Sequence, residues 1–396
     1  MPSVILKPGH VQPVWSGHPW VYSQAVERVQ GGATAGDEVT VLDPRGNYLG
    51  SGYYSPRSAI VVRIATRNPK ARLDNSWLRK RLSQAHELRH EMGLPTVRTN
   101  GFRLVHAEGD NLPGLVVDRY NETVAIQLTT LGMHRRRAMV MDAIQGVFGV
   151  KTIVDRTPTS FAKLEGFEPE PGIVCGPMDL DAYRFMERGF VYEVPMALTQ
   201  KTGYYFDQRP LRARVEQLSR GRRVLDAFCF VGSFALAAAR GGATSVLAVD
   251  ENVIALETGA RCAKANGLSD RIAFSRGSVR TLLSSSQHTA KFDLVVLDPH
   301  SMAPSQKSLQ RASKAFRWLV AQGCRVLRPG GLMVLSACSA AVDVNTLTRM
   351  LAMGARDAGM QAIVLERWFQ GMDHPVPAAF PEGLYLKSLI ARINPI

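Results

Sequence analysis

The chain has few cysteines, and their number and spacing argue against two kinds of stabilised fold. Only five occur among 396 residues, and no two of them form a CxxC pair. Structural zinc sites need closely spaced ligands, and disulfide frameworks usually need an even number of cysteines. We therefore predict neither, expect no metal, and favour a reducing cytoplasm as the compartment. The five are Cys175, Cys229, Cys262, Cys324 and Cys338.

Long apolar runs are also missing. The longest uncharged apolar stretch, residues 330–342, is much shorter than the roughly 20 residues that a membrane-spanning helix needs. The first 20 residues contain no charged segment followed by an apolar run and a small-residue cleavage site. Neither a membrane span nor export is predicted, and residues 330–342 are expected to form a buried strand and a loop.

Acidic residues are in deficit. The chain has 48 Lys and Arg against 34 Asp and Glu, a formal net charge of +14, and residues 61–140 alone hold 14 basic against seven acidic residues. A single basic run such as 135–137 could equally be a solvated helix face. An excess over a whole region favours a polyanionic partner, because Lys and Arg neutralise phosphates and release their counterions. Nucleic acid is the expected partner.

The length predicts two or three domains. The first 65 residues have short apolar runs separated by turn residues, which indicates a small β-rich module. Apolar residues at helical spacing predict a helix over 75–92 that joins two modules. A second mixed region runs from about 101 to 180, and the Gly and Pro content of residues 168–177 is typical of a linker. Expected elements before residue 168 are strands at 38–42, 59–64, 115–118 and 123–128 and a helix at 138–147.

The pattern changes after Lys201. Short, mostly apolar strands follow one another, each separated by enough chain for a helix. This is typical of an α/β fold with a doubly wound parallel sheet, whose ligand crevice lies at the carboxyl ends of the strands. Functional residues are therefore expected where strands end. The predicted strands are 224–228, 245–250, 271–274, 292–298 and 332–336.

Two strand ends predict a nucleoside site. Asp226, Phe228 and Gly232 lie where the first strand meets an Ala-rich helix. The Asp226 carboxylate could accept a hydrogen bond from an ammonium group, and Gly232 lets the backbone approach a ligand closely. Asp250 ends the second strand and could accept both hydroxyls of a ribose. The glycine fingerprint GxGxxG is missing, which disfavours a dinucleotide. Each residue alone could be an ordinary turn residue, but together they favour adenosine carrying an amino acid.

Two more strand ends carry reactive groups. Asp298, followed by Pro299, ends the fourth strand and could hydrogen-bond a base, although an Asp-Pro turn is the structural alternative. Cys338 ends the next strand. A cysteine is often only a small buried hydrophobe, and its strand-end position is what distinguishes Cys338 from Cys229, Cys262 and Cys324.

Several segments resemble bacterial large-subunit ribosomal RNA cytosine methyltransferases, and the similarity covers nearly the whole chain. The resemblance implies a PUA-like RNA-binding domain at 1–72, an α+β middle domain at 73–182 and a class I methyltransferase domain with a Rossmann-like, mostly parallel sheet at 183–396. It also implies S-adenosyl-L-methionine as cofactor and large-subunit ribosomal RNA as partner. A homodimer is left open. The segments are 200–209 (QKTGYYFDQR), 103–115 (RLVHAEGDNLPGL), 373–376 (DHPV), 380–382 (FPE) and 385–387 (YLK).

The resemblance also assigns roles to residues. It implies that the QKTG segment packs over the cofactor. Asp226 and Gly232 would lie in the first cofactor loop, and Asp250 would hold the ribose. Cys338 would be the nucleophile. Cys338 would attack carbon 6 of cytosine, because carbon 5 is too weakly nucleophilic to be methylated without such activation. Asp298 would hold the pyrimidine. The cofactor candidates are Gln200, Lys201, Thr202, Gly203, Arg209, Asp226, Phe228, Gly232, Asp250 and Ser278.

Four residues, in three places, depart from the family pattern. His300 replaces the second proline of DPP, Ala340 and Ala341 replace two histidines after the cysteine, and Ser278 replaces an acidic residue near the adenine. These differences keep two alternatives open: an RNA-binding relative that no longer turns over, and methylation of another base or of an amino group. A nicotinamide-dependent dehydrogenase is a third alternative, disfavoured by the missing glycine fingerprint.

Overall fold

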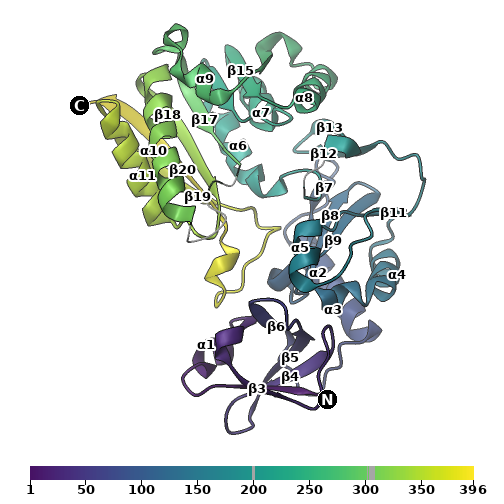
Figure 1. The fold of residues 1–396 in the computed structure, drawn as a ribbon. Coiled ribbons are helices and arrows are strands. Elements are labelled where there is room, and N and C mark those ends of the chain that lie inside the picture. Colours follow the sequence, from purple (N-terminus) through teal and green to yellow (C-terminus); the bar gives the residue numbers. More distant parts are fainter. Residues whose placement is uncertain (199–200, 301, 303–307) are drawn as a thin grey trace. The chain divides into compact units, whose positions relative to one another are not determined.

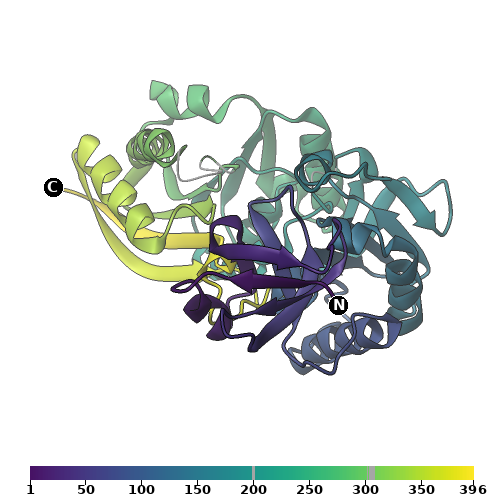
Figure 2. The same ribbon diagram turned by 60° about the horizontal axis from the view of Figure 1, so that its bottom comes forward.

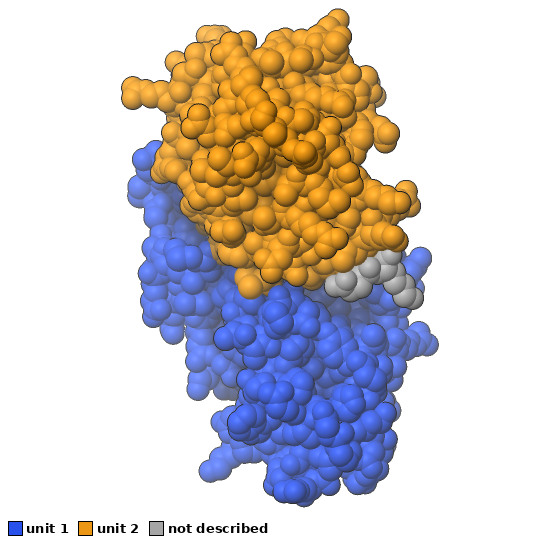
Figure 3. Space-filling model, turned by 90° about the vertical axis from the view of Figure 1, so that its left-hand side faces the viewer, with its two compact units in different colours: residues 1–192, 199–206, 372–383 blue, residues 193–198, 207–371, 384–396 orange. Residues whose placement is uncertain are grey.

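The structure is a computed structural model that describes residues 1–198, 201–300, 302 and 308–396. It divides the chain into two compact units, coloured separately in Figure 3. Unit 1 comprises residues 1–192, 199–206 and 372–383, and unit 2 comprises residues 193–198, 207–371 and 384–396. The predicted domain boundaries at residues 72 and 182 stay predictions.

The N-terminal part of unit 1 is a six-stranded sheet with strand order β2-β6-β5-β4-β1-β3, drawn in purple in Figures 1 and 2. Its core consists of alternating apolar residues such as Val39 and Val41, which are fully buried on β4 as expected for a strand with one covered face. The predicted β-rich module is confirmed. Its elements are β1 (Ser3–Leu6), α1 (Val11–Trp15), β2 (Trp20–Tyr22), β3 (Val26–Gln30), β4 (Glu38–Leu42), β5 (Tyr48–Tyr54) and β6 (Ile60–Thr66).

The middle part of unit 1 is a five-stranded sheet with strand order β11-β10-β9-β8-β7. The helix predicted over 75–92 is confirmed as α2, which packs with α4 over this sheet and contributes Leu78 and Leu82 to its core. The elements are α2 (Asn75–Glu91), β7 (Gly101–His106), β8 (Leu115–Tyr120), β9 (Thr123–Leu128), α3 (Leu131–His134), α4 (Arg137–Phe148), β10 (Thr152–Asp155), α5 (Thr159–Glu165) and β11 (Gly172–Cys175).

One predicted linker is wrong in part. Residues 168–177 include β11, whose Ile173 pairs with Val154 of the antiparallel strand β10. The Gly and Pro residues of this segment favour turns. Two apolar residues next to the edge of β10 are nevertheless enough to form a paired strand. A separate hairpin, β12 (Ala182–Glu187) and β13 (Phe190–Pro195), follows.

Unit 2 is built on a seven-stranded sheet with strand order β16-β15-β14-β17-β18-β20-β19. The neighbours from β16 to β18 pair in parallel, whereas β20 runs antiparallel to both β18 and β19. The two last strands lie side by side in yellow in Figure 2. The five predicted strands are confirmed as β14 (Arg223–Ala227), β15 (Ser245–Asp250), β16 (Ile272–Arg276), β17 (Phe292–Leu297) and β18 (Leu327–Cys338), and β19 (Met360–Phe369) and β20 (Leu386–Pro395) follow.

The strand order reverses its direction after β14, because β15 and β16 extend the sheet to one side and β17 and β18 to the other. Right-handed crossovers then place the connecting helices on opposite faces. Consistently, α7 and α8 contact β14–β16, whereas α10 and α11 contact each other and β17–β20. The helices are α6 (Arg209–Leu218), α7 (Ser233–Arg240), α8 (Val253–Ala265), α9 (Val279–Ser284), α10 (Leu309–Val326) and α11 (Val344–Asp357).

Across the described ranges, none of the helices combines the length and the apolar character needed to cross a bilayer.

Candidate active site in unit 2

The register of the parallel strands brings the predicted strand-end residues to one edge of the sheet. Ala227 at the end of β14 pairs with Val249 of β15 and with Leu297 of β17, and Leu297 in turn pairs with Leu335 of β18. Asp250 and Asp298 therefore follow directly after paired neighbours, and Cys338 lies three residues beyond Leu335. This edge holds the switch point of the sheet, where open α/β sheets bind their ligands.

Asp226 is buried next to the switch point. Its Oδ2 atom accepts a hydrogen bond from the backbone N–H of Ala235 at 2.9 Å, near the start of α7. Its Oδ1 atom is buried and has no hydrogen-bond partner among the described residues. The pKa of Asp226 is raised to about 8, mainly by burial and also by the nearby Asp298 and Asp250, although the hydrogen bond from Ala235 lowers it. An unpaired buried acceptor is costly, so it favours a donor from outside the chain.

The loop after β14 has a backbone that non-glycine residues rarely adopt. Phe228 and Phe230 have φ angles of 64° and 51°, and Gly232 has a φ angle of 70°. Left-handed conformations are uncommon for bulky residues and cluster at functional sites. A Cβ atom on Gly232 would lie 2.7 Å from the ring of Phe274, so both its conformation and its surroundings require glycine. This strained turn is consistent with the predicted cofactor loop.

Asp250 ends β15 and orders the same loop. Its Oδ2 atom accepts from the N–H of Phe230 at 2.9 Å, and its Oδ1 atom accepts from the N–H of Asn252 at 2.9 Å. Each carboxylate oxygen has more than one lone pair, so both can accept a second hydrogen bond from a ribose hydroxyl. Ser278 is brought close to this strand end, because the preceding Gly277 donates to the carbonyl of Asp250 at 3.0 Å.

Asp298 follows β17 and is bound to α6. Gln208, the residue before that helix, donates from Nε2 to Asp298 Oδ1 at 3.0 Å. The pKa of Asp298 is raised to about 7, mainly by burial and also by Asp207, whereas Arg212 and the hydrogen bonds from Gln208 and Ser336 lower it. A carboxyl group with this pKa can exchange a proton at neutral pH, as a general acid or base must.

Cys338 is the last residue of β18 and is half-buried. It lies beside the antiparallel strand β20, where Leu386 pairs with Cys338 and Lys387 pairs with Ala337. Lys387 is buried and donates from Nζ to the carbonyl of Ser339 at 2.7 Å. The other three described cysteines in this unit, Cys229, Cys262 and Cys324, are buried. Burial raises the pKa of each of these three thiols, which makes them poor nucleophiles.

The QKTG segment belongs to unit 1, and Gln200 lies outside the described residues. Thr202 Oγ1 donates a short hydrogen bond to Asp118 of β8, and Tyr120 donates to the carbonyl of Thr202 at 3.3 Å. Gly203 has a φ angle of 135°, and a Cβ atom on it would meet the ring of Tyr183. Lys201 Nζ lies 5.4 Å from the ring centroid of Tyr205. Contact of this segment with a cofactor stays a prediction.

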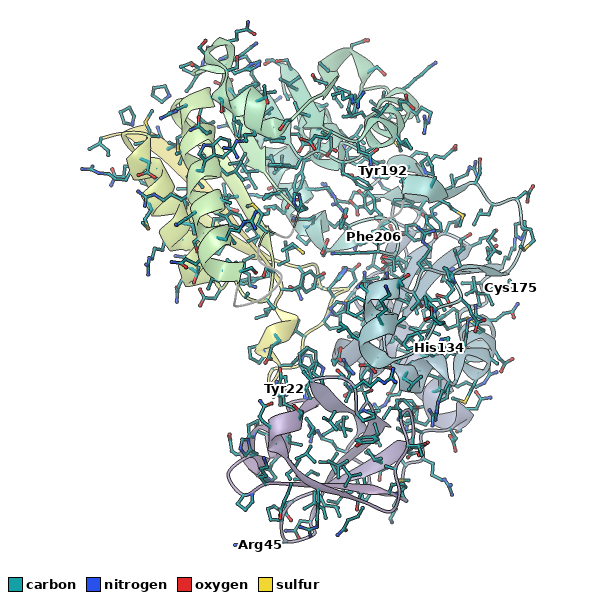
Figure 4. The ribbon with its side chains drawn as sticks, viewed as in Figure 1. Tyr22, Arg45, His134, Cys175, Tyr192 and Phe206 are labelled. Atoms are coloured by element: carbon teal, nitrogen blue, oxygen red, sulfur yellow. The ribbon has the colours of Figure 1, made fainter. Side chains whose placement is uncertain are left out.

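An aromatic cluster anchors this segment within unit 1. The rings of Phe185 and Tyr192 stack with centroids 5.1 Å apart, and Tyr204 and Phe206 pack against Phe185 at 5.0 and 5.4 Å. Tyr192 and Phe206 are labelled in Figure 4. Aromatic pairs at these distances contribute beyond the area they bury, so the residues flanking Lys201 to Gly203 are firmly held.

The remaining candidates occupy less informative positions. Arg209 is the first residue of α6 and is half-buried. Ser278 precedes α9 without a side-chain cap hydrogen bond, so its hydroxyl is not needed by the helix. Of the three family departures after β17 and β18, His300 and Ala340 are exposed and Ala341 is half-buried. Among the described residues there is no group of three or more His, Cys, Asp or Glu suited to a metal ion.

Two further polar residues contact this edge of the sheet and were not expected from the sequence. Gln208 lies in the segment 200–209 and Lys387 in the segment 385–387, but neither was predicted to act at the site. A signal for Lys387 was present, since it is a charged residue directly before the apolar run of β20. Gln208 gave no comparable signal, because its partner Asp298 is 90 residues away along the chain.

The geometry fits a nucleoside cofactor that carries an amino acid. Asp226 Oδ1 offers a buried acceptor for an ammonium group, Gly232 keeps the loop clear of a Cβ atom, and Asp250 offers acceptors to a ribose. The doubly wound sheet with this edge defines a class of protein, the Rossmann-like methyltransferases that transfer a methyl group from S-adenosylmethionine.

Comparisons with known proteins agree with this class. Residues 4–67 match the family of PUA-like domains, and residues 172–380 match the family described as S-adenosylmethionine-dependent methyltransferase. The chain is 34% identical over 392 residues to ribosomal RNA large subunit methyltransferase I of Yersinia pseudotuberculosis, covering 98% of this chain and 99% of that protein. The protein of the same name from Pseudoalteromonas translucida is 33% identical over 393 residues, covering 99% of each chain.

Solved structures show the same fold. A methyltransferase designated SMU.776, crystallised in complex with SAH, superposes with a TM-score of 0.86 at 19% identity and covers 99% of this chain and 100% of its own. A SAM-dependent methyltransferase from Streptococcus mutans superposes with a TM-score of 0.85 at 18% identity over the same shares. The chain therefore belongs to the family of S-adenosylmethionine-dependent methyltransferases that includes ribosomal RNA large subunit methyltransferase I. The predicted fold class and cofactor are confirmed.

Proposed function

We propose that this protein forms 5-methylcytosine in large-subunit ribosomal RNA through a covalent adduct with Cys338. The observation that carries the proposal is that Cys338 and Asp298 both end strands at the edge where Asp226 and Asp250 offer a cofactor site. The names of the full-length relatives support ribosomal RNA as the substrate, and the PUA-like match and the net charge of +14 support RNA binding. We further propose residues 1–72 as the RNA-docking domain.

The chemistry follows from the weakness of carbon 5 as a nucleophile. The Cys338 thiolate adds to carbon 6, the bond between carbons 5 and 6 loses its π electrons, and carbon 5 becomes nucleophilic. S-adenosylmethionine, when bound, supplies an electrophilic methyl group. After methylation, loss of the proton on carbon 5 restores the double bond and releases the thiolate. The target base must be unpaired or flipped to reach the site, which costs a few kcal/mol that RNA contacts offset.

Asp298 is proposed to carry a proton at the base. Addition of a thiolate to carbon 6 pushes electron density onto nitrogen 3, so a protonated carboxyl group near that nitrogen stabilises the adduct. The pKa of Asp298, raised to about 7 mainly by burial, keeps a substantial protonated fraction at neutral pH. Gln208 holds Oδ1 of this carboxyl group and fixes its orientation.

The test uses unmodified large-subunit ribosomal RNA and labelled S-adenosylmethionine. We expect Cys338→Ala to abolish methyl transfer while cofactor binding, measured by calorimetry, changes little. RNA containing 5-fluorocytidine should form a stable covalent complex with the wild-type protein and none with the variant, because fluorine cannot leave as the proton does. Cys324→Ala removes a buried thiol of the same unit and serves as the matched control. Full methyl transfer by Cys338→Ala would refute the covalent mechanism.

Two alternatives remain, and the same experiment separates them. The exposed His300 and the alanines at 340 and 341 stand where the family has other residues, which keeps open methylation of a different base and an RNA-binding protein without turnover. Nucleoside analysis of the labelled RNA identifies the methylated base. Cofactor and RNA binding without methyl transfer would indicate the second alternative. A homodimer is left open.

A further inference from the structure

One end of the Gln208 side-chain amide is bound, and the other end is buried without a partner. Its Nε2 atom donates to Asp298 Oδ1 at 3.0 Å. Its Oε1 atom is shielded from solvent and accepts no hydrogen bond from residues 1–198, 201–300, 302 and 308–396. Gln208 directly precedes α6, but its side chain makes no cap hydrogen bond with that helix. Neither the helix nor any other described residue thus uses the amide oxygen.

A buried acceptor in this state is unfavourable. An oxygen that loses its water without gaining a donor costs free energy, and native proteins leave few such atoms. Asp226 Oδ1 is another such atom at the same edge of the sheet, and the ammonium group of the cofactor is its proposed donor. Gln208 Oε1 requires a donor of its own, and it belongs to a side chain bound to Asp298, the carboxyl group proposed to hold the base.

The chemistry of this carboxyl group indicates what the donor is. Asp298 is proposed to carry a proton at nitrogen 3 of cytosine, and the amino group on carbon 4 lies directly beside that nitrogen. This amino group is the hydrogen-bond donor that distinguishes cytosine. We infer that Gln208 is a specificity-determining residue whose Oε1 atom accepts a hydrogen bond from the amino group of the target cytosine. The inference rests on the proposed function and identifies how the same site selects its base.

The hydrogen bond to Asp298 fixes which end of the amide is left for the base. An amide can present either its NH2 group or its oxygen, but Asp298 Oδ1 accepts from the NH2 group, so the oxygen remains. Uracil has a carbonyl oxygen on carbon 4 and a hydrogen atom on nitrogen 3. It would bring an acceptor against Oε1 and a donor against a protonated carboxyl group. A polar site of this kind rejects the wrong base because buried groups are left unpaired.

Further contacts connect Gln208 with the strand end that carries the proposed nucleophile. The preceding residue, Asp207, accepts from the hydroxyl group of Tyr385 at 2.8 Å. The carbonyl of Tyr385 accepts from the N–H of Ser339 at 2.8 Å, and Ser339 directly follows Cys338. These bonds all lie within unit 2. The start of α6 is therefore tied both to the end of β17 and to the end of β18, the two strand ends proposed to act on the base.

The experiment compares two RNA substrates that differ only in the amino group. Nucleoside analysis of labelled ribosomal RNA first locates the methylated cytidine. Two synthetic fragments of that sequence then carry either cytidine or a pyrimidinone riboside, which lacks the amino group but keeps nitrogen 3. Methyl transfer from labelled S-adenosylmethionine is measured in a single turnover at subsaturating RNA. In Gln208→Leu the ratio of the two rates, cytidine over pyrimidinone, should fall about tenfold or more relative to the wild type.

The ratio isolates the amino group, because a change in folding or in the protonation of Asp298 affects both RNAs alike. Gln208→Glu keeps an oxygen for the amino group and should retain a ratio near that of the wild type. Gln217→Leu replaces an exposed glutamine of the same helix and should change neither rate. If Gln208→Leu does not fold, Gln208→Met removes the amide oxygen at nearly the same side-chain length and is measured in its place.

The outcomes separate this inference from the proposed function. Slower transfer to both RNAs with an unchanged ratio in Gln208→Leu would overturn the inference and leave Gln208 acting through Asp298 alone. Cys338-dependent transfer to cytidine would still support the proposed function in that case. Transfer that persists in Cys338→Ala would refute the covalent mechanism whatever the ratio shows. A label on another base, or no transfer by the wild type, would refute the proposed function and the role of Gln208 with it.

Discussion

Gln208 Nε2 and Asp298 Oδ1 are joined by a hydrogen bond of 3.0 Å, which ties the start of α6 to the carboxyl end of β17. Both residues belong to unit 2, and Gln208 is 5% exposed. The bond from Gln208 stabilises the ionised form of Asp298 and so opposes the effect of burial on its pKa. Gln208 therefore helps to set the pH range in which Asp298 is protonated.

Gln208→Leu should move the falling limb of the pH profile of methyl transfer to higher pH. The hydrogen bond lowers the pKa of Asp298, so its loss raises that pKa above about 7 and extends the range in which the carboxyl group is protonated. A lost hydrogen bond to a charged group corresponds to about one pH unit. The measurement is kcat/KM for unmodified RNA between pH 6 and pH 9.5.

Gln217→Leu is the matched control for this prediction. Gln217 is an exposed glutamine on the same helix, where it accepts from Arg214 at 2.8 Å, far along the helix from Asp298. Its substitution should leave the falling limb in place. A Gln208→Leu profile that superposes on the wild-type profile would mean that Asp298 does not determine the falling limb.

The central strands of unit 2 could be predicted from the sequence because the signal is local. Residues 245–250 were predicted as a strand and form β15 with the same bounds. A buried parallel strand is apolar on both faces, so a short apolar run with turn residues on each side suffices. β19 was not predicted. Its residues alternate between half-buried and exposed, and its exposed face includes Ile363 and Leu365, so the pattern lacks the usual polar contrast.

The position of the acidic residues and of the cysteine at one edge could be predicted because a parallel sheet collects its strand ends there. The positions of Asp250 and Asp298 follow from the predicted ends of their strands alone. Gln208 and Lys387 depend instead on contacts between distant segments, across 90 and 48 residues respectively. Such contacts are set by tertiary packing and strand pairing, which composition and periodicity do not contain.

Asp250→Ala should weaken binding of S-adenosylmethionine at least tenfold. The substitution removes the acceptors proposed for the ribose and also releases the N–H of Phe230 in the strained loop. A lost hydrogen bond to a charged group costs about 1.5 to 3 kcal/mol, and 1.4 kcal/mol corresponds to a factor of ten. Calorimetric titration with the cofactor gives the dissociation constant. Ser245→Ala, at the exposed opposite end of the same strand, should bind normally. An unchanged constant for Asp250→Ala would show that the cofactor site lies elsewhere.

Asp226→Asn should change how the stability of the protein depends on pH. Burial raises the pKa of Asp226 to about 8, so the folded chain keeps a proton that the unfolded chain releases above its ordinary value of 3.8. The folded state binds more protons between these limits, and the stability of the wild type therefore falls as the pH rises from about 4 to about 8. Asparagine does not ionise and removes this contribution.

The comparison is made by urea unfolding at pH 5 and at pH 8.5. Relative to the wild type, the free energy of unfolding of Asp226→Asn should improve by about 2 to 4 kcal/mol between the two conditions. Burying an uncharged amide changes the free energy of unfolding of the variant by the same amount at both pH values. This cost cancels when the change between the two pH values is compared with that of the wild type. Asp270→Asn removes an exposed carboxylate after α8 and should show no such change. Parallel pH dependence of Asp226→Asn and the wild type would contradict the prediction.

Arg89→Met should destabilise unit 1 by about 3 to 5 kcal/mol. Arg89 is fully buried on α2, where it donates to Asp110 Oδ2 at 2.9 Å and to the carbonyl of Asp373 at 2.8 Å. Removing one partner of a buried ion pair leaves the other charge uncompensated, which costs more than the pair contributes. Arg79→Met on the same helix is the matched control, because its ion pair with Asp142 is exposed and is worth at most about 1 kcal/mol. Thermal unfolding followed by circular dichroism measures both, and equal losses for the two variants would mean that burial of the Arg89 pair has no special weight.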